Sequence, residues 1–428
     1  MAARVLALGL LLMMSAAPQV QAQLRGHGGP VRALAVLPDG QHVLSGSFDT
    51  SVIRWSLASG TAEQVLRFHE GAVNCIAVLK DGRFATSGAD ARIAIWRPGA
   101  DKPATVLQGH EAPVVGLAVS PDGRWLASAA WDHTARLWPL SSGGPRVLQG
   151  HLQNVNGVTF TPDGRAVITA GYDATVRIWP LAGDDPPVVV TLPSPLNAVA
   201  VAPDGEIMAA GANGSVYVLS PAGQKIGEIQ GTGIPVIALA LSGDGKLAAA
   251  AGIRGSVAII DRASRTIARE LVGPGLPVWS AAFLPDNHTL LTGGTDRVIR
   301  RWNASTGTPV GSVAISGPQD PLAAYAGDPG AEVFRACVAC HTLTRDEGNR
   351  AGPSLGGIFG RRIATLPGYN YSPALTKLAI VWTPETLSKL FEVGPAAYTP
   401  GTKMPEQRIG AEDRAALVKF LEKATAGH

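Results

Sequence analysis

The stretch GLAVSPDGRWLASAA, residues 116–130, decides the fold of most of this chain. Small apolar side chains recur on both sides of Pro121-Asp122-Gly123. Because Asp and Gly tolerate the backbone angles of a tight turn, this arrangement predicts a β-hairpin. Similar pairs recur every 40 to 42 residues, at Asp39-Gly40, Asp81-Gly82, Asp163-Gly164, Asp204-Gly205, Asp244-Gly245 and, with Asn in place of Gly, Asp286-Asn287. A period of this length indicates an array of seven similar units.

Each unit also carries polar residues at fixed distances from a large apolar residue. In five units an aspartate lies six residues, and a serine or threonine ten residues, before a tryptophan, and a histidine opens four of these units. Leu219 and Ile260 take the tryptophan position in the fifth and sixth units. The sets are His27, Ser45, Asp49 and Trp55; His69, Thr86, Asp90 and Trp96; His110, Ser128, Asp132 and Trp138; His151, Thr169, Asp173 and Trp179; and Thr292, Asp296 and Trp302.

This pattern resembles the WD40 repeat family, whose Gly-His opening is present at Gly26-His27, Gly109-His110 and Gly150-His151. The resemblance implies an all-β, seven-bladed propeller over residues 23–315, with a hydrogen-bonded His, Ser/Thr, Asp and Trp set inside a blade. Buried Asp and His need such partners, so we expect structural sets and not a metal or acid–base site. Either Gln23-Leu24-Arg25 or residues 310–315 would supply the outer strand of the last blade.

The first 22 residues have the features of a secretory signal peptide. Arg4 precedes an apolar run from Val5 to Met14, and small and polar residues follow as far as Ala22. The alternative is a membrane anchor, but the run is far shorter than the roughly 20 apolar residues that span a bilayer. We therefore predict cleavage after Ala22 and a mature protein that is exported and does not span the membrane.

Composition excludes some classes of partner and fold. The 428 residues include 36 Lys and Arg against 33 Asp and Glu, with no basic run, which argues against a nucleic-acid partner. Three cysteines cannot build a disulfide scaffold. Cys75, in an apolar stretch, is expected to be a buried small residue, with a reactive thiol as the alternative.

After a Pro- and Gly-containing linker at 316–327, helical periodicity replaces the repeat, which indicates a second domain over 328–428. This domain contains Cys337-Val338-Ala339-Cys340-His341, the spacing of a haem c attachment site. In a site of this kind the two cysteine thiols bond covalently to the haem, and the adjacent histidine binds the iron. A zinc site would need a second pair of ligands, and a dithiol redox motif would leave the histidine unexplained.

The second axial ligand is predicted to be Met404. Thioether sulfur is a common haem ligand, and of the five methionines Met1, Met13 and Met14 lie in the predicted signal peptide and Met208 in a predicted strand. We thus expect one haem c, covalently bound through Cys337 and Cys340.

Residues 328–428 resemble the class I cytochromes c of the mitochondrial and bacterial c2 type, which are all-α. The likeness rests on GPSLGGIFGRR (352–362), GYNYSPALTKLAIVW (368–382) and AAYTPGTKMP (396–405). It implies that the Pro353 carbonyl accepts a hydrogen bond from His341, and that Arg361, Tyr371 and Trp382 hold the haem propionates. The chain departs from the family at Leu390 and Phe391, where a tyrosine usually stands beside the methionine.

A haem whose two axial positions are both filled exchanges electrons and has no open site for substrate. We therefore expect a periplasmic electron carrier of a respiratory chain, not an enzyme, whose propeller docks a redox partner such as a dehydrogenase, terminal oxidase or reductase. The alternative is a periplasmic oxidoreductase in which the propeller holds a catalytic site and the cytochrome removes electrons. A peroxidase would need a second haem or a vacant axial position.

Overall fold

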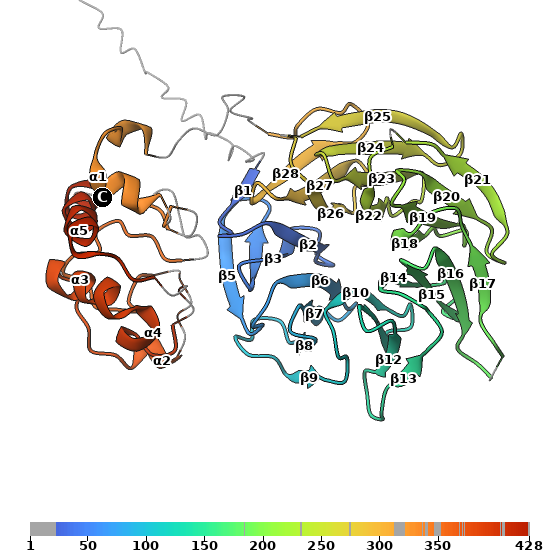
Figure 1. Ribbon diagram of the computed structural model, residues 1–428, viewed down its shortest axis with the longest axis horizontal. Coiled ribbons are helices and arrows are strands. Elements are labelled where there is room, and N and C mark those ends of the chain that lie inside the picture. Colours follow the sequence, from blue (N-terminus) through green and yellow to red (C-terminus); the bar gives the residue numbers. More distant parts are fainter. Residues whose placement is uncertain are drawn as a thin grey trace, which may run out of the picture.

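Seven four-stranded antiparallel sheets are arranged in a ring in the computed structural model, and a helical domain lies beside the ring (Figure 1). The structure describes residues 23–311 except 184, 232 and 274. It also describes residues 322–426 except 336, 339–340, 346–351, 368, 370, 372, 403 and 405–406. The predicted seven-bladed propeller is thereby confirmed. The predicted signal peptide, residues 1–22, lies outside the described residues.

Six of the seven blades consist of four consecutive strands. Blade 1 comprises β2 (Val31–Val36), β3 (His42–Ser47), β4 (Ser51–Ser56) and β5 (Ala62–Arg67). Blade 2 comprises β6 (Val73–Val78), β7 (Phe84–Gly88), β8 (Ile93–Trp96) and β9 (Thr105–Leu107). Blade 3 comprises β10 (Val114–Val119), β11 (Trp125–Ala130), β12 (Ala135–Pro139) and β13 (Arg146–Leu148).

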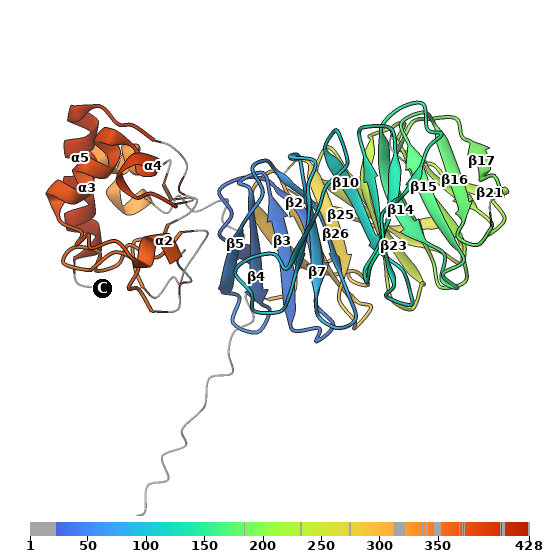
Figure 2. The ribbon, with the colours of Figure 1, turned by 90° about the horizontal axis from the view of Figure 1, so that it is seen from below.

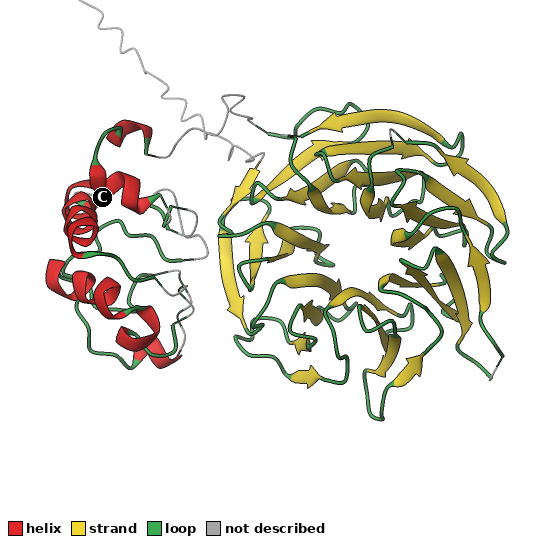
Figure 3. Ribbon diagram, in the orientation of Figure 1, coloured by secondary structure: helices red, strands yellow, loops and turns green. Residues whose placement is uncertain are grey.

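The other side of the ring repeats this plan (Figure 3). Blade 4 comprises β14 (Val155–Phe160), β15 (Ala166–Gly171), β16 (Thr175–Pro180) and β17 (Val188–Thr191). Blade 5 comprises β18 (Leu196–Val201), β19 (Ile207–Gly211), β20 (Val216–Leu219) and β21 (Lys225–Ile229). Blade 6 comprises β22 (Val236–Leu241), β23 (Leu247–Gly252), β24 (Ser256–Asp261) and β25 (Thr266–Val272).

Blade 7 joins the two ends of the propeller sequence. It comprises β26 (Val278–Phe283), β27 (Thr289–Gly294), β28 (Val298–Asn303) and, as its outer strand, β1 (Gln23–Arg25). Leu24 pairs with Ile299 and is 1% exposed. Of the two strands that the sequence left open for this position, the N-terminal one closes the ring.

The predicted hairpin at 116–130 forms β10 and β11, with Val119 opposite Leu126. In its turn Gly123 has a φ of +71°, an angle that glycine adopts readily. The Asp122 carboxylate accepts hydrogen bonds from the Ser120 hydroxyl at 2.6 Å and the Arg124 amide at 3.0 Å. The turn is thus held by its own aspartate, which explains why the Asp-Gly pair marks the repeat.

The predicted polar sets are present in blades 1 to 4. In blade 1 the imidazole of His27 bonds to Asp49 at 3.0 Å and to Ser45 at 2.7 Å, and the Trp55 indole donates to Ser45 at 2.7 Å. The same connections occur in blades 2, 3 and 4. These histidines and aspartates are used inside their own blades, which confirms the structural interpretation.

Blade 5 keeps a smaller polar set built from different residues. Asn213 takes the aspartate position, and its amide donates to the hydroxyl of the fully buried Tyr217 at 2.9 Å. The backbone N–H of Asn213 donates to the Ser194 hydroxyl at 3.1 Å. In blade 6, strand β23 contains a run of buried alanines, residues 248–251, which pack against apolar neighbours. The repeat motif is therefore weakest in blades 5 and 6, where other side chains stabilise the sheets.

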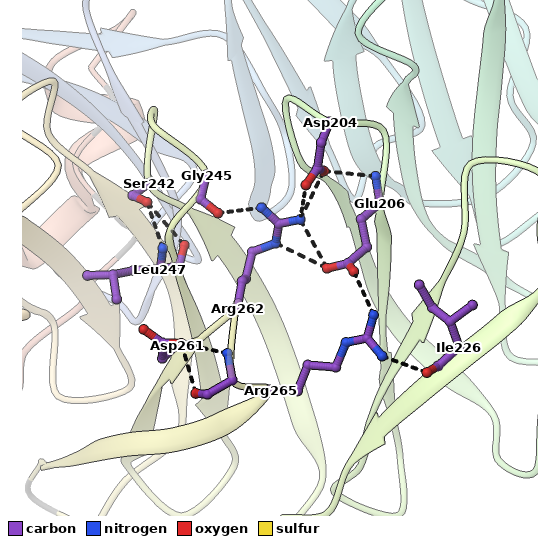
Figure 4. Close-up of polar contacts among 10 residues, drawn as sticks. Asp204, Glu206, Ile226, Ser242, Gly245, Leu247, Asp261, Arg262 and Arg265 are labelled. Carbon is purple, nitrogen blue, oxygen red and sulfur yellow. Dashed lines mark hydrogen bonds and ion pairs between the residues drawn. The ribbon is translucent and has the colours of Figure 1, made fainter.

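A charged cluster connects these two blades (Figure 4). The Arg262 guanidinium, in the turn after β24, donates to Asp204 at 2.8 Å and to Glu206 at 3.0 Å, both in the turn between β18 and β19. It also donates to the Gly245 carbonyl. Arg265 donates to the other Glu206 oxygen at 3.3 Å. Blades 5 and 6 are thus joined at their turns by ion pairs.

The C-terminal domain is built around two helices that cross closely, α1 (Pro329–Phe334) and α5 (Ala411–Thr425). At the crossing a Cβ on Gly330 would collide with the carbonyl of Ala416, so the close approach requires glycine. The Phe334 and Phe420 rings pack 5.5 Å apart in the core. The elements are η1 (Ala323–Tyr325), α1 (Pro329–Phe334), α2 (Pro373–Thr376), α3 (Pro384–Val393), α4 (Pro395–Tyr398) and α5 (Ala411–Thr425).

The predicted linker, 316–327, lies partly outside the described residues. Within its described part, Leu322 is 1% exposed in the core of the helical domain, and the Tyr325 ring lies 5.1 Å from that of Phe420. The helical domain therefore includes residues that composition alone had placed in the linker. Across the described residues, no helix is both long and apolar enough to span a bilayer.

Candidate functional site

A cavity of about 320 Å³ is lined mainly by residues of the C-terminal domain. Its apolar wall comes from α3 and α5, which contribute Leu387, Leu390, Phe391, Leu417 and Leu421. Its polar wall comes from the loops that follow α1, α2 and α4 and from the loop between 352 and 371. Seven of the residues predicted to bind or surround the haem line this cavity: Cys337, His341, Pro353, Arg361, Tyr371, Trp382 and Met404.

His341 is held in one orientation by the loop that faces it. Its Nδ1 lies 2.8 Å from the Pro353 carbonyl oxygen, so Nδ1–H donates and Nε2 is the nitrogen that would bind a metal. A Cβ at Gly352 would collide with the imidazole ring, so glycine is required for this close packing. The predicted contact between Pro353 and His341 is present in the structure.

Met404 lines the same cavity as His341, and its backbone N–H donates to the Thr402 hydroxyl at 3.1 Å. Thr399, one residue beyond α4, is buried and donates to the Pro395 carbonyl at 2.8 Å, which holds the start of this loop on the helix. Leu390 and Phe391 lie in the cavity wall. Near the methionine the wall contributed by α3 is therefore apolar.

Arg361 and Tyr371 form a polar end of the cavity. The Arg361 guanidinium donates to the carbonyls of Ser354 at 2.9 Å and Gly356 at 3.0 Å, which fixes the loop beneath His341. Burial lowers the pKa of Arg361 and raises the pKa of Tyr371 to about 12, so the Tyr371 phenol keeps its proton at neutral pH. Trp382 lines the cavity beside them. The structure thus brings together the three residues predicted to hold carboxylates.

Cys337 is buried at the end of the turn after α1 and lines the cavity. Its N–H donates to the Phe334 carbonyl at 2.8 Å, and the His341 N–H donates to the Cys337 carbonyl at 3.0 Å. This turn places the side chains of Cys337 and His341 on the same cavity. Cys340, the second predicted attachment residue, lies outside the described residues.

The lining fits a haem. A porphyrin is flat and apolar with two carboxylates on one edge, and the cavity offers apolar walls, one end with a guanidinium and a phenol, and an imidazole and a thioether. His341 and Met404 are ligands that haem iron takes in cytochromes, and the thiol of Cys337 is at hand for attachment. The donor set therefore matches the group that the motif predicts.

The sequence did not reveal that the propeller also contributes to this cavity. Val65 and Arg67 of β5, and Asp101 and Lys102 of the loop between β8 and β9, line it together with the helical domain. No repeat position or motif marks these residues, because they lie on an outer strand and a loop whose sequences vary from blade to blade.

Cys75 on β6 is half-buried, and burial raises the pKa of its thiol. A raised pKa disfavours the reactive thiolate, which fits the expectation of a packing residue.

Comparison with known families covers both domains. Residues 18–56, 60–97, 101–139, 145–180 and 265–303 match the family model "WD domain, G-beta repeat", and residues 327–425 match "Cytochrome c". The repeat segments leave out most of blades 5 and 6, where the polar sets are absent or altered.

Several curated cytochromes c are similar to the C-terminal domain. That of Sesamum indicum is 39% identical over 99 residues, 23% of this chain and 88% of the relative. That of Arabidopsis thaliana is 42% identical over 98 residues, 22% of this chain and 87% of the relative. That of Cochliobolus lunatus is 42% identical over 98 residues, 22% of this chain and 90% of the relative. Through this domain, carried behind a seven-bladed propeller of WD40 repeats, the chain belongs to the cytochrome c family.

Proposed function

We propose that this protein is a periplasmic one-electron carrier with one haem c, attached to Cys337 and Cys340 and ligated by His341 and Met404. A cytochrome c domain implies electron transfer with haem. The observation that carries the finer proposal is the imidazole of His341, fixed by Pro353 on a cavity that Met404 also lines. With both axial positions taken by side chains, the site is suited to exchange electrons and not to bind substrate.

When bound, haem supplies a metal centre that takes up and releases one electron. The chain supplies the surroundings. Pro353 orients the histidine ring, the apolar side chains of α3 and α5 exclude water, and Arg361, Tyr371 and Trp382 receive the carboxylates at the polar end of the cavity. Because these groups are held by backbone hydrogen bonds and packing, little rearrangement is needed when the charge changes.

The propeller is compatible with a protein-interaction platform, and we propose that it docks a redox partner protein. Three large side chains support this: Phe48, Trp131 and Tyr172 are 46%, 43% and 45% exposed. They occupy equivalent turns of blades 1, 3 and 4, so they lie on the same face of the ring. Exposed aromatic side chains gathered on one face are typical of interaction surfaces.

Export is proposed from the predicted signal peptide at 1–22, and the periplasm is where haem c would be attached after export. Expression in a bacterium that attaches haem c, followed by mass measurement of the periplasmic protein, tests this. The expected mass is that of a chain starting at Gln23 plus one haem. Retention in the cytoplasm, or a mass that includes residues 1–22, would contradict it.

Absorption spectra of the oxidised and reduced full-length protein test the haem site. The wild type should show one low-spin haem c per chain and a methionine–iron band at the red end of the oxidised spectrum. Met404→Ala should keep the haem, lose that band and lower the reduction potential by on the order of 0.1–0.3 V, within the span of about 0.8 V that axial ligands cover. Met208→Leu, in blade 5, is the matched control and should keep the band.

A second chromophore, or a high-spin haem that readily binds small ligands in the wild type, would contradict the carrier proposal. Either result would favour a catalytic oxidoreductase.

The docking proposal is tested by the rate at which a native periplasmic extract reduces the oxidised protein. Replacing Phe48, Trp131 and Tyr172 together by serine should slow this rate and leave reduction by ascorbate unchanged. Equal rates with the extract would contradict docking on this face.

A further inference from the structure

The cavity of the cytochrome domain faces the outer edge of blade 1. Figures 1 and 2 both place the domain beside β5, and Val65 and Arg67 of that strand line the cavity. Asp101 and Lys102, in the loop between β8 and β9 of blade 2, line it as well. The propeller therefore contributes side chains to a cavity whose other residues belong to the cytochrome domain.

A row of side chains connects the propeller to the polar end of the cavity. The Arg67 guanidinium donates to the Tyr369 hydroxyl at 3.4 Å. The ring of Tyr369 packs edge-on against that of Tyr371, with centroids 4.8 Å apart. Tyr371 in turn interacts electrostatically with Arg361. Arg67 thus belongs to the end of the cavity where Arg361 and Tyr371 lie, not to the end lined by α5.

The loop that carries Lys102 is anchored to the same strand. The side-chain amide of Gln64, a buried residue of β5, donates to the Asp101 carboxylate at 3.0 Å and to the Ala100 carbonyl at 3.2 Å. Gln64 therefore holds Asp101 against β5. The propeller's contribution to the cavity is two cations and one carboxylate, a net positive charge.

A buried carboxylate is costly unless cations or hydrogen-bond donors surround it. Within the cytochrome domain, Arg361 already uses two of its N–H groups on the backbone carbonyls of Ser354 and Gly356. We infer that Arg67 and Lys102 of the propeller complete the haem site by facing the haem carboxylates, so that the propeller forms part of the pocket and helps to set its reduction potential. This inference rests on the haem binding proposed above.

The expected direction follows from charge. An oxidised haem centre carries one more positive charge than a reduced one, so a nearby cation favours the reduced state. Replacing Arg67 or Lys102 by glutamine should therefore lower the ratio of reduced to oxidised haem at a fixed potential. A unit charge about 10 Å away, through an effective dielectric constant of about 20 to 40, changes such a ratio by a factor of about 4 to 17.

The experiment is a spectroelectrochemical titration of the full-length protein carrying haem. Arg67→Gln and Lys102→Gln should each lower the reduced-to-oxidised ratio, and the double variant should lower it further. Arg67→Lys, which keeps the charge, should remain within about twofold of wild type, since the interaction depends on charge more than on shape. Arg146→Gln, on the outer strand β13 of blade 3, removes an exposed arginine from a part of the ring far from the cytochrome domain and should change nothing (Figure 1).

Thermal unfolding and the low-spin spectrum show whether each variant is folded and loaded. If folded Arg67→Gln and Lys102→Gln variants titrate like Arg146→Gln, the inference is overturned and the haem proposal stands. If the wild type binds no haem, the proposed function itself fails. If the ratio of reduced to oxidised haem falls as much in Arg67→Lys as in Arg67→Gln, the shape of the side chain matters and not its charge. This result too would overturn the inference.

Discussion

In blade 1 the Ser45 hydroxyl receives a hydrogen bond from the Trp55 indole, whereas in blade 6 the same two positions are Ala250 and Ile260. The backbone register is unchanged: Ser45 lies opposite Ile53 on the next strand, and Ala250 lies opposite Ala258. One fold is therefore held by a buried polar set in blade 1 and by apolar packing in blade 6. The comparison shows that strand pairing and turn chemistry define a blade, and that its interior can be filled in more than one way.

Exchanging these interiors gives the largest expected effect. Ser45→Ala would leave His27 and Trp55 without their shared buried partner and should cost about 1–3 kcal/mol of unfolding free energy. The reverse change, Ala250→Ser, would bury a hydroxyl among apolar side chains in blade 6 and should also destabilise, by about 1–3 kcal/mol. Urea unfolding of both variants measures this. If both are neutral, the two kinds of interior are interchangeable and the comparison fails.

The second prediction concerns acid. Burial alone would raise the pKa of the Asp90 carboxyl, but its interactions with His69 and with backbone amides outweigh burial and lower the pKa to about 2. Because the pKa is lower in the folded state than in the unfolded state, the stability that the charged form contributes is present above about pH 4. It is lost as the pH falls towards 2.

Asp90→Asn gives blade 2 the residue that blade 5 has at Asn213, and it should remove this dependence. At pH 7 the variant should be less stable than the wild type by about 1.5 kcal/mol, since a bond to a charged group is lost. The difference should shrink between pH 4 and pH 2, measured as denaturation midpoints across that range. A constant difference would mean that the Asp90 charge does not stabilise blade 2.

The smallest effect is expected at the turns that join blades 5 and 6. Arg262→Gln breaks the ion pairs to the exposed Asp204 and to the largely buried Glu206. Because Arg265 still pairs with Glu206 and the Asp204 carboxylate returns to water, the loss should be about 1 kcal/mol. The loss should be smaller at high salt, because ions screen exposed charges. Lys246→Gln, which removes one exposed pair with Asp244, is the matched control and should have almost no effect. Equal effects would show that the cluster is not a special link between blades.

The fold could be predicted where its residues follow the repeat. Asp122-Gly123 marks a hairpin because the turn needs those side chains and backbone angles, and Trp138 marks a blade because its indole has one acceptor ten residues earlier. The closing strand β1 could not be assigned, because three residues are too few to show periodicity. Tyr217 in blade 5 and Arg262 between blades 5 and 6 could not be predicted either, since neither occupies a repeat position with a known partner.

In the cytochrome domain the sequence predicted the histidine, its carbonyl partner and the polar end of the cavity, because spacing and resemblance point to them. The contribution of Arg67 could not be predicted. It depends on how two domains lie together, and residues that meet across 302 positions of sequence leave no local pattern.

The strand β28 has a mechanical role that follows from its place in blade 7. It is the last propeller strand before the cytochrome domain, and it is hydrogen-bonded on one side to β27 and on the other to β1. The chain leaves β28 through a turn that folds back on it, where Trp302 pairs with Pro309 and the Val310 N–H donates to the Arg301 carbonyl at 3.0 Å. Tension on the connecting chain would therefore open this return before it reached the ladders of β28. The seam of the ring, where Leu24 pairs with Ile299 without a covalent link, is thus shielded from tension on the connecting chain by the segment that follows β28.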